Sequence, residues 1–212
     1  MTYKILQGIG VSCTILILPA SLRPEALYFP QLWIFAGLGV LATVFQPRYD
    51  PLKYSAGEDK GTAAQIIWSI YVTQLLIVVE AVYWRFPGSF RWDLPVAFAL
   101  TAMFAGLFLR TWAFYSLGRQ FSWHLNKETQ ETLITSGPFR YLRHPGYSGA
   151  FLTYVSTAVF LHAWFSFTVS LVLLAAAFAR RIYYEEKLLA ESFGTDYSEY
   201  QQKVKRVLPG IW

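Results

Sequence analysis

Residues 180–187, near the carboxyl end of the chain, carry a pair of opposite charges with a spacing suited to chemistry. Arg181 and Glu185 are four positions apart, so on a helix they share one face. On an exposed helix this spacing gives an ordinary ion pair worth about 0.3–0.5 kcal/mol. In a cavity at a membrane boundary, the carboxylate could instead bind a hydroxyl or ammonium group, and the guanidinium a carboxylate. The spacing alone leaves both interpretations open. It likewise leaves open whether Tyr197 and Tyr200 pack internally or form a stacking wall for a ligand.

A loop rich in proline and glycine, residues 137–149, precedes this pair and lies between two apolar segments. Pro138 and Pro145 lack backbone donors and disfavour the helical conformation in the residues before them, while the glycines permit close backbone approach. Two arginines give the loop positive charge, and the loop also contains His144. A rigid, cationic, aromatic turn at the mouth of a helix bundle could hold a polar cofactor. The alternative is a basic loop whose arginines lie at the level of the lipid phosphates.

The composition is typical of a membrane protein. Of the 212 residues, 55% are hydrophobic and only 15% are charged, whereas a soluble domain usually has about 25% charged residues. The net charge is +5, but the basic residues flank apolar segments, so anionic lipid headgroups are a simpler counterpart than nucleic acid. Cys13 is the only cysteine, which excludes an intramolecular disulfide and a thiolate metal cluster, and we expect no bound metal. The first apolar segment lacks an A-x-A-like cleavage site and is interpreted as a retained helix.

Five apolar segments organise the chain. About 20 apolar residues cross the hydrocarbon core. Residues 5–22 and 32–45 could each span if extended by flanking uncharged residues, residues 63–84 are long enough without help, and residues 94–117 form the fourth segment. The fifth segment, residues 146–179, would reach roughly 50 Å as one helix, too long for a single pass. We therefore predict a helical hairpin that turns at residues 162–164. The predicted fold is an all-α, polytopic integral membrane helix bundle with four spanning helices, a C-terminal helical hairpin and an amphipathic cytoplasmic tail.

The loops predict how this bundle is organised and oriented. Residues 1–212 are expected to form a single membrane domain, in which residues 1–117 supply the four helices and 118–212 the catalytic region. If the amino terminus, the loops at 46–62 and 118–146 and the tail share one side, few basic residues remain opposite: Arg23, Arg85 and Arg91. By the positive-inside rule the shared side is cytoplasmic, where a soluble cofactor can reach the proline loop and the tail.

Three polar residues within or beside the apolar segments are expected to have structural roles. Arg110 is expected to extend its side chain to the cytoplasmic interface. Glu80 would lie toward the opposite face, so we do not expect the two to pair. His162 is interpreted as a polar turn residue rather than a ligand. Residues 50–62 are interpreted as an exposed loop.

The carboxyl half contains two segments whose residues and spacing match a known pattern. The first is residues 133–149, which include Arg143-His144-Pro145-Gly146-Tyr147. The second contains Arg181, Glu185 and Glu186, followed by residues 193–200 and 204–209. Together they resemble the cofactor loop and the carboxyl-terminal signature of the isoprenylcysteine carboxyl methyltransferases. The resemblance covers residues 117–212, whereas the first half is similar only as generic membrane helices.

The resemblance implies an integral membrane enzyme that uses S-adenosylmethionine without a soluble Rossmann-type domain. It implies that Arg181 and Glu185 are catalytic, with Arg181 facing the substrate and Glu185 also binding the cofactor. The other residues assigned to the cofactor site are His124, Glu131, Thr132, Leu133, Ile134, Phe139, His144, Pro145, Gly146, Tyr147, Tyr197 and Tyr200. The chain departs from the family pattern at three of them, because tyrosine is common at Phe139, histidine at Glu131 and glutamine near His124.

The implied reaction is methylation of a lipophilic acceptor, such as the carboxylate of a prenylated cysteine. A carboxylate needs no general base, whereas an amine or thiol would need a proton acceptor, for which Glu185 or Glu186 would be candidates. The expected partners are a lipophilic or prenylated substrate and the lipid bilayer, with no nucleic acid. Three alternatives stay open: an NADPH-dependent sterol reductase with a similar RHPxY-type loop, a phospholipid N-methyltransferase, and a non-catalytic lipid-binding protein.

Overall fold

A computed structural model describes residues 2–46, 59–123, 125 and 131–207, and within them the chain is helical, as predicted. The long helices are α1 (Thr2–Ala20), α2 (Pro30–Val44), α3 (Thr62–Val79), α4 (Leu94–Leu117), α5 (Pro145–Phe160) and α6 (Trp164–Lys203). The short elements are the π-helix η2 (Glu80–Trp84) and the 3-10 turns η1 (Pro24–Tyr28), η3 (Gly88–Phe90), η4 (Gly118–Gln120) and η6 (Gly137–Arg140).

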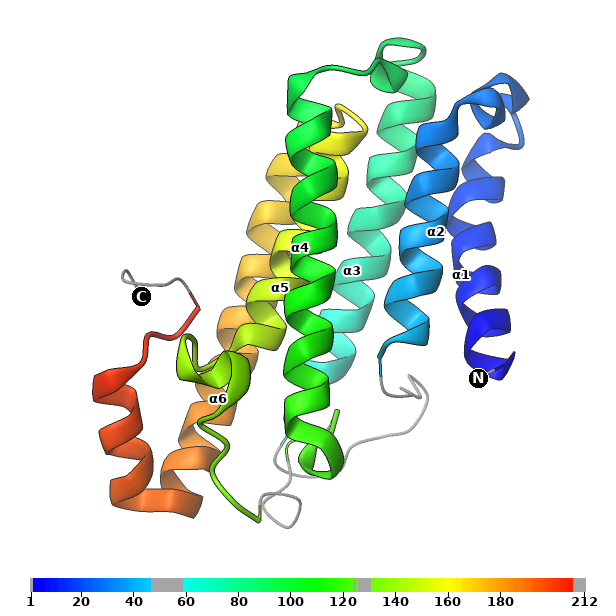
Figure 1. The fold of residues 1–212 in the computed structure, drawn as a ribbon. Coiled ribbons are helices and arrows are strands. Elements are labelled where there is room, and N and C mark those ends of the chain that lie inside the picture. Colours follow the sequence, from blue (N-terminus) through cyan, green and yellow to red (C-terminus); the bar gives the residue numbers. More distant parts are fainter. Residues whose placement is uncertain (1, 47–58, 124, 126–130, 208–212) are drawn as a thin grey trace.

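The long helices alternate in direction, so that distant parts of the chain meet at one end of the bundle (Figure 1). The amino terminus, the end of α2, the start of α3 and the end of α4 lie at the lower end of Figure 1. The start of α5 lies there too, and the last part of α6 extends beyond it. The connections after α1, α3 and α5 lie at the upper end. The proline loop and the tail therefore share one end, as the sequence predicts.

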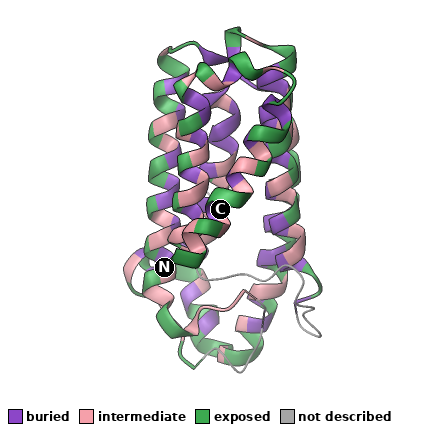
Figure 2. Cartoon of the chain, turned by 90° about the vertical axis from the view of Figure 1, so that its right-hand side faces the viewer, coloured by how far each residue is buried: buried purple, intermediate pink, exposed green. Residues whose placement is uncertain are grey.

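The outer surface of the bundle is apolar, as a lipid-facing surface requires. Four helical segments are long and apolar enough to cross a membrane: Thr2–Ala20, Thr62–Trp84, Leu94–Gln120 and Trp164–Lys203. The 15-residue α2 is shorter and reaches roughly 22 Å of a hydrocarbon core about 30 Å thick. Figure 2 shows buried residues on the inner faces of the helices and exposed residues on the outer faces. Many exposed side chains are large and apolar, including Trp33, Trp68, Phe98 and Phe108.

The predicted hairpin is confirmed. Helix α5 ends at Phe160, His162 adopts a positive φ of 50°, and α6 begins at Trp164. The second arm is longer than expected, because α6 has 40 residues rather than about 15. It continues beyond the apolar segment into the charged tail and bends at Gly194, the one residue within it with non-helical angles (φ 51°, ψ −117°).

Buried polar contacts close the upper end of the bundle. The Glu80 carboxylate accepts hydrogen bonds from the backbone N–H groups of Phe165 (3.1 Å) and Ser166 (2.7 Å), and so caps the start of α6. The His162 ring lies 2.8 Å from the Asp93 carboxylate. These contacts confirm that His162 is a polar turn residue, and they keep Glu80 at the end opposite the proline loop.

Helices α4 and α5 approach so closely that only glycine fits at two facing positions. A Cβ atom added to Gly106 would lie 2.6 Å from the carbonyl oxygen of Gly149. One added to Gly149 would lie 2.5 Å from the carbonyl oxygen of Gly106 and 2.6 Å from the backbone nitrogen of Arg110. The Thr153 hydroxyl donates to the Gly149 carbonyl at 2.8 Å beside this contact. Small residues are the usual means of close helix packing in membranes, and here they fix the position of Arg110, one turn after Gly106.

We predict that Gly149→Ala separates α4 from α5 and lowers the free energy of unfolding by about 1–3 kcal/mol, the usual cost of overpacking. Thermal unfolding of the detergent-solubilised protein, followed by tryptophan fluorescence, measures the effect. Gly37→Ala is the matched control, because a Cβ added to this helical glycine meets nothing within 4 Å. Equal midpoints for the two variants would contradict the close contact.

Candidate functional site

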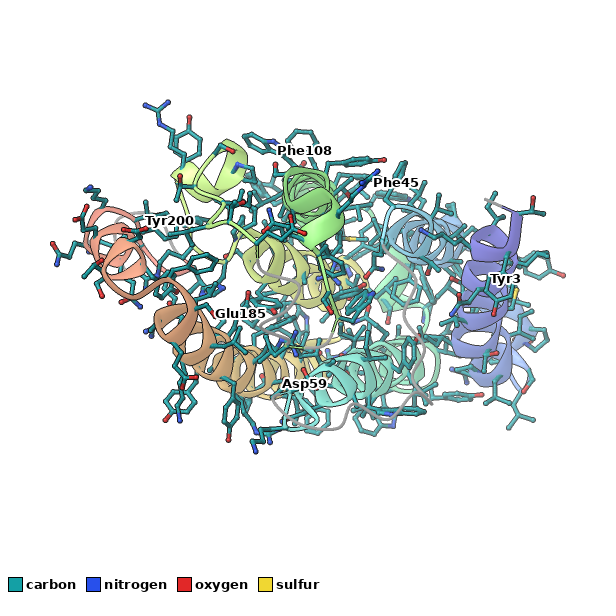
Figure 3. The ribbon with its side chains drawn as sticks, turned by 90° about the horizontal axis from the view of Figure 1, so that it is seen from below. Tyr3, Phe45, Asp59, Phe108, Glu185 and Tyr200 are labelled. Atoms are coloured by element: carbon teal, nitrogen blue, oxygen red, sulfur yellow. The ribbon has the colours of Figure 1, made fainter. Side chains whose placement is uncertain are left out.

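A cavity opens at the lower end of the bundle, the end viewed in Figure 3. It contains about 1220 Å³ of space between protein atoms, including the part open to solvent. Its walls come from α3, α4, α5 and α6 and from the segments that follow α4. The predicted site residues that line it are Thr132, Leu133, Ile134, Phe139, His144, Gly146, Tyr147, Arg181, Glu185, Tyr197 and Tyr200.

Two of the predicted site residues, Glu131 and Pro145, do not line this cavity. Glu131 borders an adjoining groove, together with residues of the tail such as Asp196 and Glu199. Pro145 is buried as the first residue of α5, where its missing N–H costs no helical hydrogen bond. His124 lies outside the described residues.

The predicted pair on α6 is joined through a tyrosine rather than directly. Arg181 Nε donates to the Tyr147 hydroxyl at 3.0 Å, and that hydroxyl donates to Glu185 Oε2 at 2.6 Å. Both α6 side chains thus contact the hydroxyl of Tyr147, a residue of α5 that lines the cavity. Arg181 is only 4% exposed, so the interpretation of an ordinary surface ion pair is wrong.

Arg181 forms its ion pair with Asp59, just before α3. Asp59 is 1% exposed, which corrects the interpretation of residues 50–62 as an exposed loop at this position. Its carboxylate also accepts hydrogen bonds from the N–H groups of Ala63 (3.2 Å) and Leu125 (3.4 Å). Burial raises the pKa of Asp59, but the Arg181 guanidinium and these hydrogen bonds outweigh it and hold the pKa below its usual value. Asp59 therefore stays ionised and links α3, α6 and the segment after α4.

Glu186, adjacent to Glu185 in sequence, lies outside the cavity lining and binds the side chains of Arg143, His144 and Arg206. Its Oε1 accepts from Arg143 Nη2 at 2.9 Å and lies 3.2 Å from His144 Nε2, and its Oε2 accepts from Arg206 Nη2 at 2.6 Å. Glu186 is 7% exposed. With both oxygens engaged it is a structural anchor, so it is not available as the proton acceptor considered from the sequence.

Backbone contacts continue this anchor between the proline loop and the tail. Arg143 N–H donates to the carbonyl of Lys205 at 2.8 Å, and His144 N–H donates to that of Arg206 at 3.0 Å. The Tyr200 hydroxyl donates to the carbonyl of Phe139 at 2.5 Å. The two segments therefore form one wall, although they lie far apart in the chain.

Arg110 points into the cavity rather than toward the membrane interface, so the expected extension to the interface is wrong. It is 4% exposed and lines the cavity. Its guanidinium lies 4.8 Å from the ring centre of Phe114 and 5.9 Å from that of Trp123. The helix contact at Gly149 brings the backbone of α4 against α5 at this level, and the Arg110 side chain reaches Gln46, after α2, and the Gly146 carbonyl of α5.

An apolar and aromatic wall completes the cavity. Phe121 lies 4.6 Å from Phe114 and 5.4 Å from Trp123, measured between ring centres. The remaining apolar lining comes from Ala63, Ile66, Ala113, Leu117, Leu125, Phe178, Leu189 and Phe193. One cavity thus combines charged groups with an extended apolar surface, and it fits ligands that are partly polar and partly lipophilic.

Comparison with known proteins identifies the family. Residues 98–191 match the isoprenylcysteine carboxyl methyltransferase (ICMT) family. A probable protein-S-isoprenylcysteine O-methyltransferase from Oryza sativa subsp. indica is 40% identical over 191 residues, which cover 85% of this chain and 97% of the relative. The chain belongs to the isoprenylcysteine carboxyl methyltransferase family. Protein-S-isoprenylcysteine O-methyltransferase B from Arabidopsis thaliana is 35% identical over 68% of this chain and 73% of its own length.

The ICMT fold also matches in three dimensions. The solved structure of the eukaryotic intramembrane Ras methyltransferase ICMT superposes with a TM-score of 0.66 at 23% sequence identity. The match covers 94% of this chain and 74% of that chain. It confirms the fold class, including the first half of the chain, where the sequence resembles the family only as generic membrane helices.

In this ICMT-family chain, sequence reasoning missed the roles of two charged residues: Arg110 in the cavity lining and Asp59, the ion-pair partner of Arg181. Arg110 stands in an apolar helix, where the usual expectation is extension to the interface. Asp59 stands three residues before Thr62, the first residue of α3, outside the usual N-cap position, which Gly61 occupies. Their partners Arg181 and Gly146 are far away in the chain, so local spacing could not place either residue in the site.

We predict that Glu186→Gln weakens the anchor and lowers the stability of the fold by about 3–5 kcal/mol, because it leaves buried cations without their carboxylate. Thermal unfolding in detergent measures the loss. Glu199→Gln is the matched control on the same helix, since Glu199 forms an exposed i,i+4 pair with Lys203 and should change the midpoint little. A Glu186→Gln protein as stable as this control would contradict the anchoring role.

Proposed function

We propose that this member of the ICMT family is an integral membrane methyltransferase that methylates the carboxylate of a prenylated cysteine, with S-adenosylmethionine as the methyl donor. The relatives reported above are named protein-S-isoprenylcysteine O-methyltransferases. The observation that carries the proposal is the meeting of both signature segments around one cavity that has a polar and an apolar side.

The polar side of the cavity fits the methyl donor. When bound, S-adenosylmethionine would supply a methyl group on a positively charged sulfur, which leaves as a neutral thioether. The Glu185 carboxylate lines the cavity and accepts a hydrogen bond from Tyr147, which leaves lone pairs for a cation or hydroxyl. The residues proposed to hold the donor are Glu131, Thr132, Leu133, Ile134, Phe139, His144, Pro145, Gly146, Tyr147, Glu185, Tyr197, Tyr200 and, from the sequence pattern, His124.

The apolar side of the cavity fits the lipid part of the acceptor. Ile66 of α3, Ala113 of α4 and Phe178 of α6 face this space from three helices. Arg181 uses donors on Tyr147, Asp59, Thr62 and the carbonyl of Trp123. Its role in the proposal is to orient the acceptor while it holds the Tyr147 and Glu185 side chains in place.

In the proposed reaction, the main task of the protein is to position the two reactants. With the donor bound, a carboxylate acceptor would take the methyl group directly as the carbon–sulfur bond broke, and no proton would need to be transferred. Holding two reactants in line can itself lower a barrier by about 7–11 kcal/mol. This agrees with a site in which both oxygens of Glu186 are engaged by protein side chains.

The orientation in the membrane is part of the proposal. The cavity lies at the end of the bundle that carries most of the basic residues, which by the positive-inside rule faces the cytoplasm. The membrane location itself follows from the family and the apolar helices. A soluble donor would then enter from the cytoplasm, and the lipid acceptor from the bilayer.

The alternatives drawn from the sequence are not favoured. Membership of the ICMT family places the chain among methyltransferases rather than among NADPH-dependent reductases. The relatives named above are O-methyltransferases, which also argues against a phospholipid amine as the acceptor.

We predict that the purified chain transfers radiolabelled methyl groups from S-adenosylmethionine to N-acetyl-S-farnesylcysteine. Arg181→Lys keeps the charge but cannot bridge Tyr147, Asp59 and the Trp123 carbonyl as the planar guanidinium does, so turnover should fall by more than tenfold. Glu185→Gln should weaken donor binding, measured by calorimetry with S-adenosylhomocysteine, because a charged hydrogen bond contributes roughly 1.5–3 kcal/mol.

Controls separate the proposed function from its alternatives. Lys187→Gln, on the exposed face of α6 and outside both the cavity and the adjoining groove, should leave methyl transfer unchanged. Saturable NADPH binding without binding of either adenosyl compound would favour the reductase. Wild-type kinetics in both Arg181→Lys and Glu185→Gln would show that the two residues belong to the structure and not to the reaction.

We also predict that the cavity end faces the cytoplasm. In a Cys13→Ser background, single cysteines at Ser136 and Ser198, both exposed at the cavity end, should react with a membrane-impermeant maleimide only after the membrane is opened. A cysteine at Ser21, at the other end of α1, should react in intact cells. Labelling of Ser136 and Ser198 from opposite sides would contradict both the orientation and the shared site.

A further inference from the structure

The arginines that line the cavity differ in how their charges are balanced. Arg143 pairs with Glu186 at 2.9 Å, and Arg181 pairs with Asp59. Arg110 is as buried as Arg181, at 4% exposure, yet no carboxylate among the described residues pairs with it. It is the one lining arginine in the described part of the chain without an anionic partner.

The contacts of Arg110 are with neutral groups. Its Nη2 donates to the side-chain oxygen of Gln46 at 2.7 Å, and its Nη1 donates to the carbonyl of Gly146 at 3.4 Å. Its Nε is buried and has no hydrogen-bond partner. The aromatic rings of Phe114 and Trp123 face the guanidinium, so they stabilise the cation without neutralising it.

A buried charge without a counter-ion is costly and is usually paired. The rigid setting of Arg110 makes relief by movement difficult, because the contact of Gly149 with the Arg110 backbone holds that part of α4 against α5. No described carboxylate supplies this partner, and the cavity that Arg110 lines gives a ligand access to the guanidinium. A guanidinium with free donors binds carboxylates in a planar, two-pronged geometry.

We propose that Arg110 is the anion-binding residue of the cavity and that it binds a carboxylate group of a ligand. Arg181, whose charge Asp59 already balances, is not the main counter-ion. The inference rests on the proposed function, in which both ligands carry a carboxylate: the methyl acceptor at its reacting group and the methyl donor on its amino-acid part. Arg110 is opposite in charge to Glu185, so the cavity offers one site for a cation and one for an anion.

The test compares each ligand with a copy that lacks the carboxylate. For the donor site, calorimetry measures the affinities of S-adenosylhomocysteine and its decarboxylated analogue. For the acceptor site, inhibition of methyl transfer compares the KM of N-acetyl-S-farnesylcysteine with the Ki of its carboxamide. In the wild-type chain, one of the two pairs should show at least a tenfold preference for the carboxylate. The pair that shows it identifies which ligand Arg110 binds.

Variants then assign the preference to Arg110. Arg110→Gln should reduce the tenfold preference to less than threefold while the carboxylate-free ligand binds as before, which a loss of fold would not produce. Arg110→Lys, which keeps the charge, should retain part of the preference. Arg119→Gln is the matched control, because Arg119 is exposed just after α4 and lies outside the cavity lining, and its preferences should equal those of the wild type.

The outcomes separate this inference from the proposed function. A wild-type chain without preference in either pair overturns the inference, even if no Arg110 variant folds. So does an unchanged preference in folded Arg110→Gln. In both cases, methyl transfer by the wild type leaves the proposed function intact. A wild-type chain that binds no adenosyl compound and transfers no methyl group overturns the proposed function, and the inference with it.

Discussion

A single buried carboxylate, Glu186, holds the lower end of this molecule together. The proline loop and the tail are separated by the whole α5–α6 hairpin, yet Glu186 binds Arg143 and His144 of the loop and Arg206 of the tail. Its own position on α6 is fixed by the bundle. The backbone bridge from residues 143 and 144 to residues 205 and 206 follows from this contact, and the loop and the tail become one wall of the cavity.

Helix geometry explains how α6 serves both the anchor and the cavity. Successive residues on a helix point about 100° apart, so the neighbours Glu185 and Glu186 face different surroundings. Glu186 faces the loop and the tail, whereas Glu185 faces the cavity and Tyr147. Arg181, one turn earlier, reaches both Tyr147 and Asp59. The charged part of α6 is thus a rigid strip that connects the tail, α5 and the start of α3, which explains why the helix continues so far beyond the apolar segment.

The sequence predicted the elements whose signals are local. The length of the fourth apolar segment predicted α4 with the bounds observed. The fifth segment is too long for one crossing and has a histidine in its middle, which predicted the hairpin of α5 and α6. The match of the loop and the tail to a family pattern predicted most of the cavity lining on that side. In each case the signal lay within one element or one continuous motif.

The sequence could not predict contacts between residues far apart in the chain. The i,i+4 spacing of Arg181 and Glu185 suggested a direct pair, but Arg181 binds Asp59, which is 122 positions away. In the sequence, Arg110 stands near the end of an apolar helix and resembles an arginine that extends to the membrane interface. Its burial in the cavity depends on the packing of α5 against α4. The choice between Glu185 and Glu186 depended on which side of α6 meets the loop, and only the tertiary packing decides that.

Two charges that line the cavity, on Glu185 and Arg110, could bind charged reactants more tightly than neutral products. The fold balances Arg143 and Arg181 internally and leaves Glu185 and Arg110 to face the cavity. Methyl transfer to a carboxylate removes one positive and one negative charge together, since a sulfonium becomes a thioether and a carboxylate becomes an ester. Interactions with both charges weaken at that step. If the acceptor provides the carboxylate at Arg110, its neutral ester loses that contact as it forms, and the product can leave for the bilayer without a change in the fold.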